Sequence, residues 1–144
     1  MSNIYQVFNL DTGEMREARH NAPLDECSPN LYVSEFASRD GNEIVPYHPD
    51  IAEVFQIIRD KYGPLEVGRG FTSNSHNKTI PGASLMSKHK DGTAIDIIIP
   101  NGIKGEVFLI EIIGMIGTHY GFGLYDNHIH IDLRGEFVFW DSRK

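Results

Sequence analysis

The middle of the chain reads Thr93-Ala94-Ile95-Asp96-Ile97-Ile98-Ile99. Isoleucines surround one aspartate, and Gly92 and Pro100 bound the run, which is the pattern of a buried strand. An ionised carboxylate in such a strand is costly unless it is paired or bound to a metal. We therefore expect a compensating cation near Asp96, although a hydrogen bond from an arginine or a backbone amide would also satisfy it.

A second strand is indicated near the C-terminus by His128-Ile129-His130-Ile131-Asp132-Leu133. Strand periodicity places its two histidines and its aspartate on one face and its apolar residues on the other. A lone histidine on such a strand is commonly a hydrogen-bonded structural residue. Its occurrence together with His89, which lies seven positions before Asp96, favours a shared site.

These residue types are suited to zinc. Imidazole nitrogens and carboxylate oxygens are common zinc ligands, and a catalytic zinc site keeps three protein ligands and an open position for water. His89, Asp96 and His130 would supply two imidazoles and one carboxylate. A zinc ion held in this way lowers the pKa of bound water to about 7 and polarises a carbonyl, as amide hydrolysis requires. We therefore predict one Zn2+ per chain.

Composition limits the other possibilities. The 144 residues are the length of one domain, so we expect residues 1–144 to form a single domain and the chain to be a monomer. The net charge of −7 disfavours nucleic acid as a partner, because phosphate binding needs clustered Lys and Arg. The single cysteine excludes an internal disulfide. Residues 1–10 lack the features of a signal peptide, and the apolar run over 107–116 is too short for membrane insertion, which predicts synthesis in the cytoplasm.

The remaining pattern predicts an α+β fold with a mostly antiparallel sheet packed against two main helices. We expect helices over 49–62 and 105–120, the second ended by Gly121 and Gly123 and central because it is apolar nearly all round. The other expected elements are a hairpin over 4–18, a loop over 22–30, a helical turn over 34–39, strands over 42–46 and 65–71, a polar loop to about residue 83, and a terminal hairpin of strands 128–133 and 137–140.

The segment around His89 resembles a known signature. Zinc D-alanyl-D-alanine carboxypeptidases and related phage endolysin peptidases, whose fold is shared with the Hedgehog signalling domain, carry Ser-x-His-x-x-Gly-x-Ala-x-Asp. All the fixed positions match, at Ser87, His89, Gly92, Ala94 and Asp96. Residues 130–134 and 139–140 also resemble the third-ligand strand of the short branch of that family. The resemblance covers about residues 31–140 and leaves 1–30 as an N-terminal hairpin and loop.

This resemblance implies a Hedgehog/D-Ala-D-Ala-peptidase-like fold, zinc held by His89, Asp96 and His130, and peptidoglycan stem peptide as the substrate. Ser87 would orient a ligand or touch substrate. His128 matches the non-ligand histidine of the His-x-His pair and would hydrogen-bond the zinc water or the oxyanion.

The residues after His130 are candidates for support or for substrate binding. Asp132 would hold a ligand histidine through that histidine's second nitrogen. Arg134 would either pair with Asp132 or bind a substrate carboxylate.

The chain departs from the family pattern at two positions. Many relatives carry, where this chain has Thr72, an arginine that helps hold substrate or stabilise the oxyanion. Arg69 is three positions away, with opposite strand parity, and need not reach the same point. Relatives with a Glu or Asp a few residues before the third ligand use that residue as general base. Asn127 stands there in this chain, so Asp126 becomes the candidate base, with a plain turn residue as the alternative.

The expected function is hydrolysis of peptidoglycan stem-peptide amide bonds, in cell-wall lysis or remodelling. D,D-carboxypeptidase and endopeptidase activity are equally compatible with the sequence. The enzyme would act at the cell wall or in the periplasm after release, in a phage or a bacterium. The alternatives are a catalytically weak or inactive zinc-binding structural or interaction module of the same fold, and another zinc amidohydrolase.

Overall fold

The computed structural model describes residues 4–80 and 87–144. The described residues form a five-stranded sheet of order β10-β8-β9-β7-β6, a three-stranded sheet of order β2-β1-β5 and a two-stranded sheet of β3 and β4. The strands are β1 (Ile4–Asn9), β2 (Met15–Arg19), β3 (Pro23–Asp25), β4 (Ser28–Tyr32), β5 (Ile44–Tyr47), β6 (Val67–Arg69), β7 (Ala94–Ile98), β8 (Gly121–Leu124), β9 (His128–Asp132) and β10 (Val138–Asp141). The helices are α1 (Val33–Phe36), α2 (Pro49–Tyr62), α3 (Asn74–Asn77) and α4 (Gly105–Ile116), with a 3-10 turn, η1 (Lys88–Asp91).

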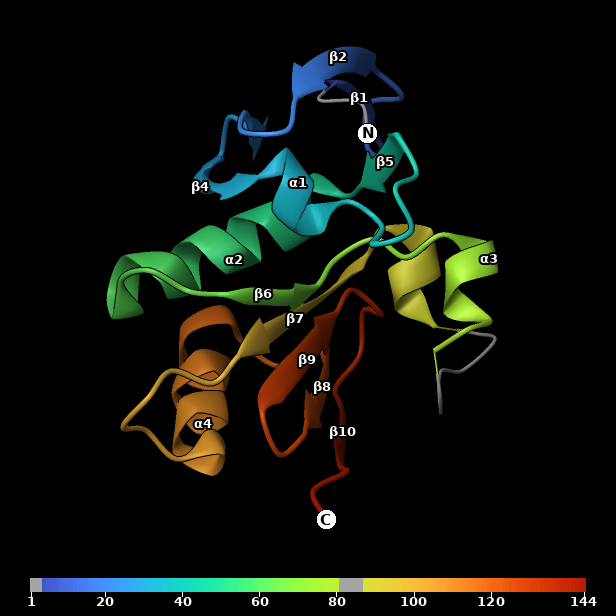
Figure 1. The fold of residues 1–144 in the computed structure, drawn as a ribbon. Coiled ribbons are helices and arrows are strands. Elements are labelled where there is room, and N and C mark those ends of the chain that lie inside the picture. The colour runs from blue at the N-terminus through green and yellow to red at the C-terminus, as the bar shows by residue number, and fades with distance from the viewer. Residues whose placement is uncertain (1–3, 81–86) are drawn as a thin grey trace.

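The predicted α+β class is confirmed, and the predicted helix 49–62 is α2. In Figure 1 this helix runs between the N-terminal sheets and the five-stranded sheet. His48 caps its start, since His48 Nδ1 accepts a hydrogen bond from the Asp50 amide at 3.1 Å. Gly63 follows its end with a φ of 81°, a conformation that favours glycine.

The second predicted helix is shorter than expected. α4 stops at Ile116 because Gly117 takes a φ of 93°, and the chain then continues into β8. Gly121 and Gly123 therefore belong to a strand, and the expectation that they end the helix is wrong. The helix is also not central, since Val107 and Ile110 are 41% and 68% exposed.

Three further elements differ from the expectation. The expected terminal hairpin does not form, because both edges of β9 are taken by β7 and β8. β10 instead pairs in parallel with β8 at the edge of the sheet. The expected loop over 22–30 contains the antiparallel pair β3 and β4. The expected polar loop contains α3, and its last part, residues 81–83, lies outside the described residues.

No helix in the described ranges has the length and apolar character needed to span a membrane.

The five-stranded sheet has one apolar and one polar face. The apolar face is fully buried in the hydrophobic core and consists mainly of Ile95, Ile97, Phe122, Ile129 and Ile131. The opposite face carries the alternate residues of the same strands. Cross-strand register aligns one residue from each strand of that face in a single row, in the order Arg69, Asp96, His130, Gly123 and Trp140. The candidate site lies along this row, at Asp96 and His130.

Candidate metal centre

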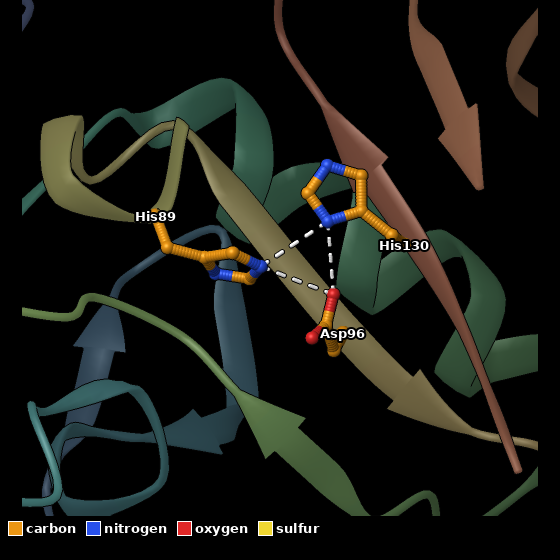
Figure 2. Close-up of side chains that lie close together, drawn as sticks. All are labelled: His89, Asp96 and His130. Atoms are coloured by element: carbon orange, nitrogen blue, oxygen red, sulfur yellow. Dashed lines mark hydrogen bonds and ion pairs between the residues drawn. The ribbon is translucent and has the colours of Figure 1, made fainter. Parts of the chain in front are cut away.

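Three side chains point at one another on the polar face of the sheet. Figure 2 shows His89 reaching in from η1, Asp96 from β7 and His130 from β9. His89 Nε2 lies 3.1 Å from Asp96 Oδ1 and 3.1 Å from His130 Nδ1, and His130 Nδ1 lies 2.9 Å from Asp96 Oδ1. All three residues are buried, and they form a group that could hold a metal ion.

The outward nitrogens of the two imidazoles determine what faces inward. His89 Nδ1 lies 2.7 Å from the Gly70 carbonyl oxygen and donates its hydrogen to it. His130 Nε2 likewise donates to Asp132 Oδ2 at 2.7 Å. A neutral imidazole carries one N–H, so in the neutral form of both rings each inward nitrogen presents a lone pair. Two nitrogen lone pairs and a carboxylate oxygen therefore converge on one point, which calls for a cation.

The electrostatics of the trio agree with this requirement. Burial lowers the pKa of His89 and keeps it neutral, although the Asp96 carboxylate acts in the opposite direction. Burial alone would raise the pKa of Asp96, but the two imidazoles outweigh burial and hold that pKa well below its usual range. Burial would lower the pKa of His130, and the Asp132 and Asp96 carboxylates outweigh it and raise that pKa. A proton on His130 or a metal ion supplies the positive charge, and metal binding would release that proton.

The triangle also fits zinc by size. Ligand atoms about 2.0–2.2 Å from a tetrahedral zinc ion lie roughly 3.3–3.6 Å from one another. The edges of 2.9–3.1 Å observed between the three atoms are only slightly shorter. With two imidazoles, one carboxylate and an open fourth side, the residues present fit a zinc ion.

Local backbone features place His89 in this triangle. Ser87 caps η1, its hydroxyl accepting from the His89 amide at 3.3 Å. Gly92 ends η1 with a φ of 72°, and a Cβ at that position would lie 2.4 Å from the Pro46 carbonyl oxygen. Gly70 packs directly on Phe36, where a Cβ would meet backbone atoms at 2.6 Å. The signature serine and glycine thus form the turn that carries the histidine.

Gly70→Ala is expected to lower the free energy of unfolding by about 1–3 kcal/mol and to weaken zinc binding, because the added methyl overpacks Phe36 and shifts the carbonyl that orients His89. Urea denaturation and zinc titration measure the two effects. Gly114→Ala is the matched control, since a Cβ there meets nothing within 4 Å. Equal stability and zinc affinity in the Gly70 and Gly114 variants would contradict the expectation.

A second chain of contacts supports His130. Arg134 Nε and Nη2 each donate to the Asp132 carboxylate at 2.7 Å, and Asp132 accepts from His130. Burial alone would raise the pKa of Asp132, but the hydrogen bonds from Arg134 and His130 hold that pKa well below its usual range. Gly121 leaves room for this cluster, because a Cβ there would lie 2.4 Å from Arg134 Nε.

Asp132→Asn is expected to weaken zinc binding by about 10–100-fold, because the carboxylate that holds His130 loses its charge and Arg134 loses its partner. Competition with a chromophoric chelator measures the affinity. Asp126→Asn removes an exposed carboxylate as the control and should bind zinc like the wild type. A zinc Kd within twofold of the wild type for Asp132→Asn would refute the supporting role.

His128 lies beside the trio on the same strand face as His130. Its Nε2 is 3.6 Å from the second oxygen of Asp96. Its ring stacks on Tyr125 with centroids 4.5 Å apart, and the Tyr125 hydroxyl accepts from Trp140 Nε1 at 2.9 Å. Trp140 in turn packs against His130.

Trp140 is a residue beside the site that was not predicted from the sequence. The available signal was the Gly121-Phe122-Gly123 alternation, because Gly123 leaves the space that Trp140 fills.

Asp126 lies apart from these residues. It occupies the exposed turn between β8 and β9, where its carboxylate accepts from the Lys144 amide at 3.3 Å. Within residues 4–80 and 87–144, no hydrogen bond or ion pair joins Asp126 to the trio. Arg69, in contrast, is the cross-strand neighbour of Asp96. β6 ends at Arg69, so the expectation that this strand continues to residue 71 is wrong.

Comparison with known proteins agrees with this geometry. A sequence model of the family described as Peptidase M15 matches residues 26–132, which include all three residues of the trio. No curated protein and no solved structure matched the chain. The resemblance predicted from the sequence is thereby confirmed. Since the match covers most of the 144 residues, the chain belongs to the Peptidase M15 family, whose members are zinc-dependent metallopeptidases.

Proposed function

We propose that the chain is a zinc peptidase that hydrolyses amide bonds of peptidoglycan stem peptides, as a D,D-carboxypeptidase or an endopeptidase. The observation that carries the proposal is the triangle of three inward-facing acceptor atoms with the His128 imidazole beside it. Membership of the Peptidase M15 family supports the reaction class. The stem-peptide substrate, and action at the cell wall after release, come from the resemblance of the signature segment.

In this proposal His89 Nε2, Asp96 Oδ1 and His130 Nδ1 hold the zinc ion. When bound, zinc supplies a Lewis acid that polarises the amide carbonyl and makes water acidic enough to act as a nucleophile near neutral pH. Asp132 keeps the His130 ring in the tautomer that presents Nδ1, and the Gly70 carbonyl does the same for His89.

His128 is the proposed acid–base group. Among the described residues of this face, Asp96 faces the metal position and Asp132 is bound by His130 and Arg134, so neither carboxylate is available to take a proton. His128 Nε2 lies 3.6 Å from Asp96 Oδ2, so its imidazole, a group able to accept and donate protons, stands beside the metal position. It would take the proton of the attacking water and return it to the departing amine. Stacking on Tyr125 holds the ring in place for both transfers.

The proposal is tested with purified, zinc-loaded protein and isolated sacculi. We expect release of D-alanine or of new amino termini, detected by chromatography and mass spectrometry. A sample stripped with a chelator is the control and should regain the activity when zinc is restored. A protein that binds one zinc ion per chain but releases neither product would overturn the proposal and favour the inactive zinc-binding module.

A further inference from the structure

Arg69 occupies the end of the row that contains the trio. It is the register partner of Asp96 across β6 and β7, although the ladder is irregular between Val67 and Arg69. Burial lowers the pKa of Arg69 and the Asp96 carboxylate acts in the opposite direction, so the two charged groups lie within reach of each other. The guanidinium is held in a fixed position. Its Nε donates to Thr72 Oγ1 at 2.8 Å, and its Nη2 donates to Asn77 Oδ1 at 2.7 Å. Thr72 and Asn77 are each only 1% exposed, so packing fixes the two side chains that bind the guanidinium.

Both side chains that hold Arg69 are neutral. Within the described part of the chain, Arg69 has no carboxylate oxygen within 4.0 Å. Arg134, the other arginine of this face, differs in that Asp132 engages it through both carboxylate oxygens. Arg69 is half-buried, and a guanidinium stays charged even in such surroundings. A half-buried guanidinium whose hydrogen-bond acceptors are both neutral is suited to bind an anion from outside the chain. Its planar arrangement of N–H donors matches the two oxygens of a carboxylate.

We infer that Arg69 is the receptor for a substrate carboxylate and that Thr72 and Asn77 are positioning residues that aim it. This inference rests on the proposed peptidase function and narrows its substrate class. Because Arg69 is the direct neighbour of Asp96, the recognised carboxylate lies close to the amide that is cleaved. The carboxylate is either the C-terminus of the peptide, which makes the enzyme a carboxypeptidase, or a free carboxylate within the stem peptide, which makes it an endopeptidase.

The test starts from the bond that is cleaved. Sacculus digests identify that bond by mass spectrometry, and the peptide around it is synthesised with each carboxylate either free or amidated. We expect amidation of one carboxylate to lower the wild-type kcat/KM at least tenfold, mainly through KM. The position of the carboxylate whose amidation lowers kcat/KM shows whether Arg69 binds the C-terminus of the peptide or a carboxylate within the stem peptide. Arg69→Gln should cleave the acid and the amide with similar kcat/KM, and Arg69→Lys should keep part of the preference.

Asn77→Asp provides a second variant that keeps the size of the side chain. It places a carboxylate 2.7 Å from Arg69 Nη2, so it should raise KM for the acid peptide at least fivefold and leave KM for the amide unchanged. Arg143→Gln, at an exposed arginine near the C-terminus, controls for the loss of a positive charge. Equal wild-type kcat/KM for all peptides, or an undiminished preference in Arg69→Gln, would overturn the inference while leaving the peptidase function intact. Absence of any cleavage in the first step would instead overturn the proposed function and the inference with it.

Discussion

His89→Ala is expected to abolish zinc binding and peptidase activity together. The substitution removes one of three converging acceptor atoms and leaves Asp96 and His130 without the geometry for a tetrahedral ion. Zinc content, measured by mass spectrometry on desalted protein, should fall from about one ion per chain to near zero. Hydrolysis of sacculi should fall to the uncatalysed background.

Thermal unfolding gives a readout that does not depend on activity. Zinc at 1,000 times its Kd stabilises a folded protein by about 4.1 kcal/mol, so the wild-type Tm should rise on zinc addition. The Tm of His89→Ala should not respond. His119→Ala removes an exposed histidine as the control and should behave like the wild type. A His89→Ala protein that keeps one zinc ion per chain, or a zinc-dependent Tm, would show that the ion binds elsewhere.

His128→Ala is expected to lower kcat by about 10²–10⁴-fold while zinc content stays near one ion per chain. The physical reason is that His128 would transfer protons without being one of the three converging ligands, since its Nε2 lies 3.6 Å from the outer oxygen of Asp96. Steady-state kinetics on the identified peptide and zinc analysis of the same sample measure both properties. Added imidazole should restore part of the activity.

Asp126→Asn is the matched comparison, because Asp126 is the other candidate base and lies in an exposed turn bound to the Lys144 amide. It should keep kcat within about threefold of the wild type, in line with the small effect of most surface substitutions. Large loss in Asp126→Asn together with normal kcat in His128→Ala would reverse the assignment of the base.

The elements whose signals are periodicity and residue spacing could be predicted from the sequence. The alternation His128-Ile129-His130-Ile131-Asp132 fixes which side chains share a face, and the observed register of β9 with β7 follows it. The helix α2 is signalled by Pro49 at its start and Gly63 after its end, and the structure has these bounds. Local chemistry is enough for such elements, because caps and periodicity act over a few residues.

The parts that depend on strand pairing could not be predicted in the same way. A terminal hairpin is the simplest interpretation of residues 128–140, but β8, which looked like the end of a helix, takes the edge of β9 that the hairpin needed. β10 then pairs with β8 in parallel. Trp140 packs against His130 because β10 pairs with β8 and not with β9, so no local pattern around Trp140 reveals this contact.

The surroundings of Arg69 show the same limit. In a continuous strand, Arg69 and Thr72 would point to opposite faces. The chain instead leaves the sheet after Arg69, and the Thr72 hydroxyl and the Asn77 side-chain oxygen accept hydrogen bonds from the guanidinium. A turn of this kind is set by packing of Gly70 on Phe36, which lies far away in the sequence. Contacts between distant segments decide such positions, and one sequence does not encode them as a recognisable pattern.

The most direct test of the central claim is an anomalous difference map at the zinc absorption edge, from crystals of the zinc-loaded protein. We expect a single strong peak inside the triangle, about 2.0–2.2 Å from His89 Nε2, Asp96 Oδ1 and His130 Nδ1, with an open side next to His128. A map with the peak at another site, or with the three side chains hydrogen-bonded to one another and no peak between them, would contradict it.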